Sequence, residues 1–239
     1  MMKGTLYGIG VGPGDPELIT LKAVNILKKI DVVIAPRTQK NEKSTALNIA
    51  MPHLRQNTEI LELVFPMVYD ENQLNEAWLD GKNTILNLLE QGKQVAFLTL
   101  GDPMLYSTYI YIFRLLAPHR VDIQTIPGIT SFCAAGSRLG YPLAEGNDIV
   151  SIIPATCGQD KLARALDYSD SVVLMKVYRN INEVVDQLKS HHLSEQAVMI
   201  SKCGHPDETI HYQIDRSADL KPVYLSTILA KKSLSKQVE

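Results

Sequence analysis

The chain has 239 residues, of which 45% are hydrophobic and 21% are charged, and its formal net charge at pH 7 is −2. This composition is typical of a folded globular protein and excludes a disordered chain. The weakly acidic balance also disfavours a dedicated nucleic-acid-binding protein, because neutralising phosphates requires a basic surface.

Apolar runs that end at glycine or proline alternate with helical stripes through the first half of the chain. Strands are expected at residues 5–11, 31–36, 59–65, 94–100 and 121–126. Helices are expected at residues 16–29, 44–51, 74–91, 105–116 and 131–139. In the first of these helices, Asp15 is the expected N-cap and Pro16 the first helical residue. This alternation predicts an α/β fold with a mostly parallel sheet.

A segment rich in glycine and proline, residues 140–148, is typical of a linker. Beyond it, strands are expected at 149–154, 171–177, 196–202, 209–214 and 222–230, the last two in a meander, with a helix at 181–190. The sequence therefore predicts two α/β domains, 1–142 and 143–239, with a cleft between them. The polar tail from Lys231 to Glu239 is expected to fray.

The most informative local feature is the glycine-rich loop that follows the first expected strand, Gly8 to Pro16, with sequence GIGVGPGDP. Its spacing is compatible with the G-x-G-x-x-G pattern of nicotinamide dinucleotide sites. Against that reading, Pro13 and Pro16 interrupt the turn and the helix start, and Arg37 rather than an acidic residue follows the second strand. A purely structural tight turn is a further alternative.

Two more loops follow expected strands. Gly101-Asp102-Pro103 comes after the fourth strand, and Pro127-Gly128-Ile129-Thr130-Ser131 after the fifth. A structural role predicts Asp102 as the N-cap of the next helix. A functional role predicts that the backbone of Gly101 and Asp102 faces a ligand. Because α/β proteins bind ligands at the carboxyl ends of their strands, three such loops favour a binding site there.

Cysteine and histidine usage predicts neither a disulfide framework nor a metal site. The three cysteines, Cys133, Cys157 and Cys203, are far apart, which favours a reducing cytoplasm. None of the six histidines belongs to a zinc-binding pattern. The first residues do not form a signal peptide, and no apolar run approaches the ~18 residues of a membrane span, so we expect no membrane association.

In order along residues 5–230, the motifs GxGPGDP, GDPxxY, PGITS, MKVYRN and YLSTILA resemble those of the tetrapyrrole methyltransferases. The resemblance implies a cytoplasmic, homodimeric enzyme that uses S-adenosylmethionine. Residues 35–37, 175–180 and 224–228 are similar to the corrin-pathway members that methylate C20 of precorrin-2 or cobalt-factor II in cobalamin biosynthesis. Pro36-Arg37 stands where uroporphyrinogen III methyltransferases of the family have Asp-Arg, so that activity is not expected.

The resemblance also implies which residues hold the methyl donor, largely through their backbone. They are Pro13, Leu100, Gly101, Asp102, Leu105, Tyr106, Thr130, Ser131, Met175, Lys176, Val177, Gly204 and His205. His205 departs from the family, which often has threonine after this glycine. Tyr106 and Tyr109 are expected either to line the cleft or to pack their helix.

A methyl group on a sulfonium is already activated, so its transfer needs alignment and exclusion of water more than a strong base. No catalytic residue is assigned. The many carboxylates of such a substrate favour arginine, which binds them through paired hydrogen bonds. Arg37 and Arg179 are the candidates, with Lys176 as a further one, and a solvated surface charge is the alternative for each.

Several other functions remain open from the sequence. Within the family, the acceptor is alternatively another corrin position, a diphthamide precursor on a protein, or an rRNA ribose. Outside it, the glycine loop is compatible with a nicotinamide-dependent oxidoreductase. A module that binds S-adenosylmethionine without turnover is the last alternative.

Overall fold

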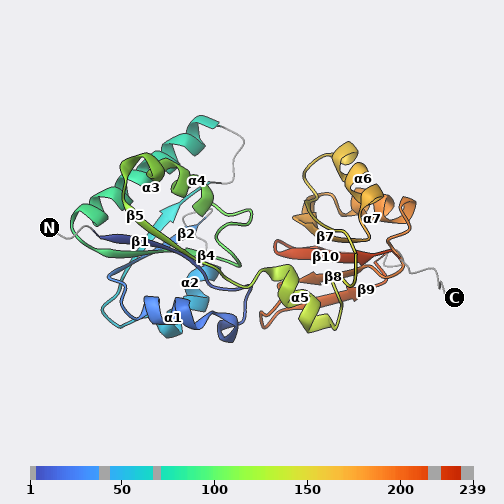
Figure 1. Cartoon of the computed structure of the whole chain (residues 1–239), viewed down its shortest axis with the longest axis horizontal. Helices are drawn as coiled ribbons and strands as arrows, with labels where there is room; N and C mark the ends of the chain where they lie inside the picture. The colour runs from blue at the N-terminus through green and yellow to red at the C-terminus, as the bar shows by residue number, and fades with distance from the viewer. Residues whose placement is uncertain (1–3, 38–43, 67–70, 215–221, 233–239) are drawn as a thin grey trace. The chain divides into compact units, whose positions relative to one another are not determined.

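The computed structural model describes residues 4–37, 44–66, 71–214 and 222–232, shown as coloured ribbon in Figure 1. The chain divides into two compact units, Met1–Thr130 and Ser131–Glu239. The helix that begins at Ser131 groups with the second unit, whereas the sequence-based boundary after residue 142 leaves it in the first. Among the described residues, no helix is long and apolar enough to cross a membrane.

The first unit is built on a five-stranded sheet in which every pair of neighbours is parallel. The strand order is β3-β2-β4-β1-β5. Their bounds are β1 Thr5–Gly10, β2 Val32–Arg37, β3 Glu59–Val64, β4 Gln94–Thr99 and β5 Asp122–Ile126. The central strands β2 and β4 have continuous apolar, buried runs, residues 32–35 and 95–98, because helices cover both faces of the sheet, as in other parallel sheets.

Helices lie on both faces of this sheet, α1 and α2 on one and α3 and α4 on the other (Figure 1). The helices are η1 Pro16–Leu18, α1 Leu21–Leu27, α2 Thr45–Ala50, η2 Met51–His53, α3 Glu71–Glu90, α4 Tyr109–Leu116 and η3 Ala117–His119. Each face has its own buried core, so the parallel α/β prediction is confirmed for this unit.

The first predicted helix, 16–29, is in fact two helices. Asp15 Oδ1 accepts a hydrogen bond from Glu17 N at 2.8 Å and caps only the short turn η1. Thr20 Oγ1 then accepts from Ala23 N at 3.2 Å and caps α1. The apolar spacing alone did not reveal this second cap, because it continues through both segments.

The second unit has a mixed sheet with the order β6-β7-β10-β8-β9. Its strands are β6 Val150–Pro154, β7 Ser171–Met175, β8 Val198–Ser201, β9 Thr209–Tyr212 and β10 Ser226–Lys231. Only β6 and β7 are parallel, and the remaining pairs are antiparallel. The predicted meander of the last two strands is wrong, because β10 inserts between β7 and β8, where its apolar residues are buried on both faces.

The helices of this unit are α5 Ser131–Leu139, α6 Gln159–Tyr168, η4 Val177–Arg179 and α7 Ile181–Ser190. Side chains of α6 and α7 fill the core over one face of the sheet, and α5 contacts β10. The sequence analysis did not predict α6. Only Leu162 and Leu166 are buried along this helix, so its apolar stripe is narrow.

The tail that was expected to fray begins with a buried residue instead. Lys231 is the last residue of β10 and is 7% exposed. Its Nζ lies 2.6 Å from Glu145 Oε1 and 2.9 Å from Asp148 Oδ2, both in the segment predicted as a linker. Residues 233–239, the rest of that tail, lie outside the described residues.

Candidate functional site

The three predicted loops converge at the carboxyl edge of the first sheet. Gly12 and Gly101 form a bridge in which Gly101 N donates to Gly12 O at 2.8 Å and Gly12 N to Gly101 O at 3.4 Å. The chain leaves β1 toward β2 on one side and leaves β4 toward β5 on the other. These two connections run over opposite faces of the sheet, and open α/β sheets bind ligands at the carboxyl ends of such strands.

Backbone packs directly on backbone between these loops. A Cβ atom on Gly128 would lie 2.1 Å from Gly101 O, and one on Gly10 would lie 2.6 Å from the same oxygen. Gly101 itself has a φ of +70°, and a Cβ there would meet only Ile129 O, at 3.9 Å. Two glycines therefore hold the loops together, while Gly101 leaves room beside its Cα for a ligand to approach the backbone.

Asp102 ties two of the loops together. Its Oδ1 accepts from Met104 N at 2.8 Å, and its Oδ2 accepts from Gly128 N at 3.0 Å. The prediction that Asp102 caps the next helix is wrong, because α4 begins at Tyr109, after a turn. The same carboxylate instead fixes its own loop to the loop after β5.

The segment between Asp102 and α4 presents one aromatic side chain to solvent. Tyr106 is 43% exposed and has a φ of +49°, a conformation that costs energy for residues other than glycine. Ser107 Oγ donates to Pro103 O and closes the turn. Leu105 and Leu100 are partly buried beside it. The loop geometry thus turns Tyr106 away from the core.

Tyr109, by contrast, packs in the core. Its side chain is fully buried, and its hydroxyl lies 2.8 Å from Thr125 Oγ1. Burial raises the pKa of this phenol. A Cβ on Gly8 of β1 would lie 2.1 Å from the ring of Tyr109, so only glycine at this position leaves room for that ring. Of the two roles considered for Tyr109, packing is confirmed.

Two buried threonine hydroxyls at this edge have no hydrogen-bond partner within the part of the chain that the structure describes. They are Oγ1 of Thr99, the last residue of β4, and Oγ1 of Thr130, in the loop after β5. Buried polar atoms are normally paired, so two such atoms at this edge mark a place for a ligand or water. Pro13 is buried in the first loop, and Ser131 begins α5.

In the second unit, the predicted residues Met175, Lys176 and Val177 lie at the carboxyl end of β7. Lys176 is exposed with a φ of +60°. The Val177 side chain is fully buried in the core, so only its backbone is available to a ligand. Because β7 and β8 both run antiparallel to β10, their carboxyl ends share one edge of the sheet.

The loop after β8 carries Gly204 and His205 at that edge. Glu208, whose side chain is 12% exposed, accepts from Gly204 N at 2.8 Å and from Arg138 Nε of α5 at 3.1 Å. Burial, with Glu208 nearby, raises the pKa of the Cys203 thiol to about 11, so this thiol is not a nucleophile at neutral pH. Glu208 was not predicted from the sequence as a residue that supports this loop. Its partners are a backbone amide and a side chain far away in the sequence, and no local pattern indicates either contact.

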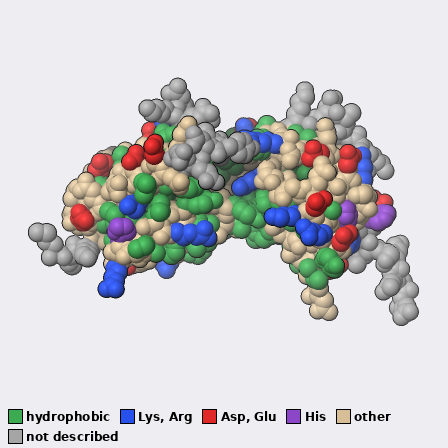
Figure 2. Space-filling view, turned by 90° about the horizontal axis from the view of Figure 1, so that it is seen from above, with side chains coloured by type: hydrophobic (Ala, Val, Ile, Leu, Met, Phe, Trp, Pro, Cys, Tyr) green, Lys and Arg blue, Asp and Glu red, His purple; other side chains and the backbone are tan. Residues whose placement is uncertain are grey.

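The two candidate arginines have different surroundings. Arg37 ends β2 and forms an ion pair with Glu62 of β3. Arg179 lies in η4, with its guanidinium carbon 5.2 Å from the centre of the Tyr178 ring. No cluster of side chains suited to hold a metal ion occurs in the described ranges. On the face shown in Figure 2, both basic and acidic side chains are scattered among hydrophobic and other surface.

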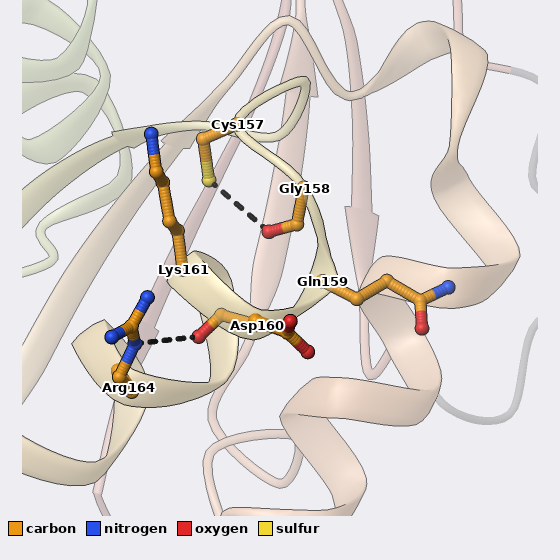
Figure 3. Close-up of a pocket in the computed structure, with 6 residues that line it drawn as sticks. All are labelled: Cys157, Gly158, Gln159, Asp160, Lys161 and Arg164. Atoms are coloured by element: carbon orange, nitrogen blue, oxygen red, sulfur yellow. Dashed lines mark hydrogen bonds between the residues drawn. The ribbon is translucent and has the colours of Figure 1, made fainter.

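An open pocket of about 340 Å³ lies at the start of α6. Its lining residues are Cys157, Gly158, Gln159, Asp160, Lys161 and Arg164. Arg164 Nε donates to Asp160 O at 3.2 Å, and the Lys161 and Cys157 side chains extend to the same side while Asp160 points away from them (Figure 3). No predicted site residue belongs to this pocket.

Structure therefore brings together Pro13, Gly101, Asp102 and Thr130 in the first unit, and separately Lys176 and Gly204 near one sheet edge in the second. The sequence analysis did not name Gly10, Gly128 or Thr99 as site residues. Both glycines belong to motifs of the glycine loops, so the sequence could have indicated them. For Thr99, the only indication in the sequence is its place at the end of an expected strand.

Comparison with known proteins identifies relatives over the whole chain. The model of the family "Tetrapyrrole (Corrin/Porphyrin) Methylases" matches residues 5–214. A cobalt-precorrin-2 C(20)-methyltransferase of Salmonella typhimurium is 37% identical over 233 residues, 97% of this chain and 98% of that protein. A probable cobalt-precorrin-2 C(20)-methyltransferase of Methanocaldococcus jannaschii is 37% identical over 77% of each chain.

Solved structures share the fold. The X-ray structure of a cobalt precorrin-4 methyltransferase matches with a TM-score of 0.73 at 23% identity, covering 95% of this chain and 94% of that one. A uroporphyrin-III C-methyltransferase from Thermus thermophilus, solved in complex with S-adenosylhomocysteine, matches with a TM-score of 0.71 at 18% identity, covering 95% and 97%. These likenesses establish the two-unit α/β fold.

Proposed function

Because the chain belongs to the tetrapyrrole (corrin/porphyrin) methylase family and is a methyltransferase, we propose that it methylates C20 of precorrin-2 or of its cobalt complex, in cobalamin biosynthesis. The observation that carries this proposal is the 37% identity to the Salmonella enzyme over 97% of the chain. Both relatives described above are named for the cobalt complex, which favours that form as the acceptor.

We propose S-adenosylmethionine as the methyl donor, and the residues at the first sheet's edge fit it. A Cβ on Gly101 would meet only Ile129 O, at 3.9 Å, so space remains beside its Cα, and the hydroxyls of Thr99 and Thr130 are buried and unpaired among the described residues. When bound, the donor would supply a methyl group on a positively charged sulfur. After the transfer, the rest of the donor is a neutral thioether. These two hydroxyls would orient it by hydrogen bonds, and the backbone of Gly101 and Asp102 would lie beside it.

The full set proposed for the donor follows the family resemblance. In the first unit it comprises Pro13, Leu100, Gly101, Asp102, Leu105, Tyr106 and Thr130, and in the second Ser131, Met175, Lys176, Val177, Gly204 and His205. Support comes from the placement of each group at the carboxyl edge of its own sheet. Val177 contributes backbone only, since its side chain is in the core.

For the acceptor, we propose that arginines bind the peripheral carboxylates. Arg179 is exposed and adjacent to the β7 edge, and it can form paired hydrogen bonds with a carboxylate. Arg37 shares its guanidinium with Glu62, so a substrate carboxylate there competes with that ion pair. The site residues position the two reactants and exclude water, and the C20 proton leaves after the new carbon–carbon bond forms.

The test is mass spectrometry of the tetrapyrrole after anaerobic incubation with S-adenosylmethionine, using precorrin-2 and cobalt-factor II in parallel. We expect cobalt-factor II to gain one methyl group. A gain on precorrin-2 alone would reverse the preference for cobalt. Suppose that neither tetrapyrrole gains a methyl group, while calorimetry shows that the protein still binds S-adenosylhomocysteine. The proposed acceptor would then be wrong, and the assignment as a methyltransferase would stand.

A further inference from the structure

We propose that Tyr178, Arg179 and Tyr224, here called the aromatic edge, form a contact surface for the ring of the tetrapyrrole acceptor. This inference rests on the proposed function and adds Tyr178 and Tyr224, which have no role so far, to the proposed substrate-binding residue Arg179. The aromatic edge lies at one end of the second unit's sheet, where β7 finishes and β10 begins.

The three side chains form one contiguous group. The Tyr178 and Tyr224 rings meet edge to face, with centroids 5.8 Å apart and an interplanar angle of 79°. The guanidinium carbon of Arg179 lies 5.2 Å from the centre of the Tyr178 ring. The pairing of Thr227 with Met175 brings the two segments side by side, although they are distant in sequence.

Tyr224 stands at the tip of a firmly held turn. Ser226 Oγ accepts from Val223 N at 3.0 Å and donates to Val223 O at 2.7 Å, and Ser201 Oγ lies 2.7 Å from it. Ser226 is 3% exposed, whereas Tyr224 is 53% exposed. A buried hydroxyl network thus presents a large aromatic side chain to solvent, although burial of such a ring is normally favourable.

Backbone strain accompanies both tyrosines. Leu225, next to Tyr224, has a φ of +75°, and Lys176, two residues before Tyr178, has a φ of +60°. Residues other than glycine rarely adopt this conformation, and where it occurs the surrounding structure enforces it, often at functional sites. Two energetically unfavourable backbone conformations therefore lie close to these rings in the chain.

The chemistry of the group selects its ligand. The exposed ring of Tyr224, packed on the half-buried ring of Tyr178, favours contact with a broad ring, and the adjacent guanidinium favours a carboxylate at that ring's rim. The adenine of the methyl donor is also a flat ring, but it carries no carboxylate beside it. A tetrapyrrole has both features, because carboxylate side chains surround its macrocycle. The aromatic edge therefore fits the acceptor.

The experiment compares ligand affinities of variants under anaerobic conditions. Tyr224→Leu and Tyr178→Leu remove the rings, Tyr224→Phe keeps the ring, and Tyr212→Leu on β9 is the control, since Tyr212 is 61% exposed in the same unit. Tyrosine fluorescence quenching gives the Kd of cobalt-factor II, and calorimetry gives that of S-adenosylhomocysteine. We expect both Leu variants to bind cobalt-factor II about tenfold more weakly. Tyr224→Phe and the control retain wild-type affinity, and all variants retain S-adenosylhomocysteine affinity.

The outcomes separate this inference from the proposed function. If wild type binds S-adenosylhomocysteine but neither cobalt-factor II nor precorrin-2, the proposed acceptor is wrong, and the inference falls with it. If wild type binds cobalt-factor II and the Leu variants bind it equally well, only the aromatic edge is overturned. If the Leu variants bind S-adenosylhomocysteine more weakly and cobalt-factor II as wild type does, the aromatic edge contacts the methyl donor. That result would also overturn the inference. Because Tyr224 is exposed, its Leu variant keeps the test valid should Tyr178→Leu fail to fold.

Discussion

Asp102 illustrates how one carboxylate supports a site built mostly from backbone. Its two oxygens accept from two amides, Met104 N in its own turn and Gly128 N in the neighbouring loop. Gly128 in turn packs its Cα against Gly10 and Gly101, where no side chain fits. A single residue thereby fixes the relative position of loops that follow β4 and β5.

We expect Asp102→Ala to weaken S-adenosylhomocysteine binding and to lower the free energy of unfolding by about 1–3 kcal/mol, because two amides lose a charged acceptor. Asp102→Asn keeps only one acceptor oxygen, so its effect is intermediate. Calorimetry gives the affinity and urea unfolding the stability. Asp15→Ala, which removes a cap in the first loop, serves as control. Unchanged affinity in a destabilised Asp102→Ala variant would show that the loop is only structural.

At the scale of elements, β10 organises the second unit. It lies between β7 and β8, and its first residues hold the turn that presents Tyr224. Its last residue, Lys231, anchors the segment that follows α5 through Glu145 and Asp148. The hydrogen bond from Lys231, aided by the Glu145 amide, lowers the pKa of the Asp148 carboxyl, and the same two acids raise the pKa of Lys231.

This anchor predicts a pH dependence of stability. A carboxyl whose folded pKa lies below its unfolded value of 3.8 stabilises the fold above that pH, and the contribution is lost as the pH falls through the folded pKa. We expect Lys231→Met to be less stable than wild type at pH 7, with the difference shrinking below about pH 4. Urea unfolding from pH 7 to pH 3 measures it, with the exposed Lys189→Met as control. A stability difference between Lys231→Met and wild type that stays constant from pH 7 to pH 3 would contradict a stabilising ion pair between Lys231 and Asp148.

At the scale of the whole molecule, the chain consists of two α/β units, and in both the loops proposed to hold the methyl donor occupy the same kind of position. In each unit these loops follow the carboxyl ends of parallel-running strands, β1, β4 and β5 in one and β7 and β8 in the other. The family relationship, which spans residues 5–214, covers both units. Orientation of the two reactants can supply several kcal/mol of a reaction barrier, so we expect binding residues rather than a catalytic triad to carry the transfer.

The family resemblance also predicts a homodimer. We expect size-exclusion chromatography with light scattering to give a mass about twice the 26.6 kDa of one chain. If the dimer is obligate, the mass will hold on tenfold dilution, because obligate interfaces are in general large and apolar. A mass of one chain at every concentration would contradict the prediction.

Much of this protein was determined by local sequence. Buried runs such as those of β2 and β4 specify parallel strands, because only a sheet covered on both faces tolerates apolar residues at every position. The helix at 181–190 was predicted with its observed bounds, since its apolar spacing is regular. The glycine loops indicated the site, because glycine at strand ends is needed where backbones approach closely.

Other features were decided only by the tertiary structure. The spatial order of strands placed β10 between β7 and β8, and this turned a supposed fraying Lys231 into a buried ion-pair partner. The bonds from Asp102 to Gly128 and from Glu208 to Arg138 join residues far apart in the chain. No local pattern encodes them, because a hydrogen bond across the fold depends on where two elements meet and not on the residues beside either one. The sequence thus named the loops and the chemistry, and folding decided which atoms meet.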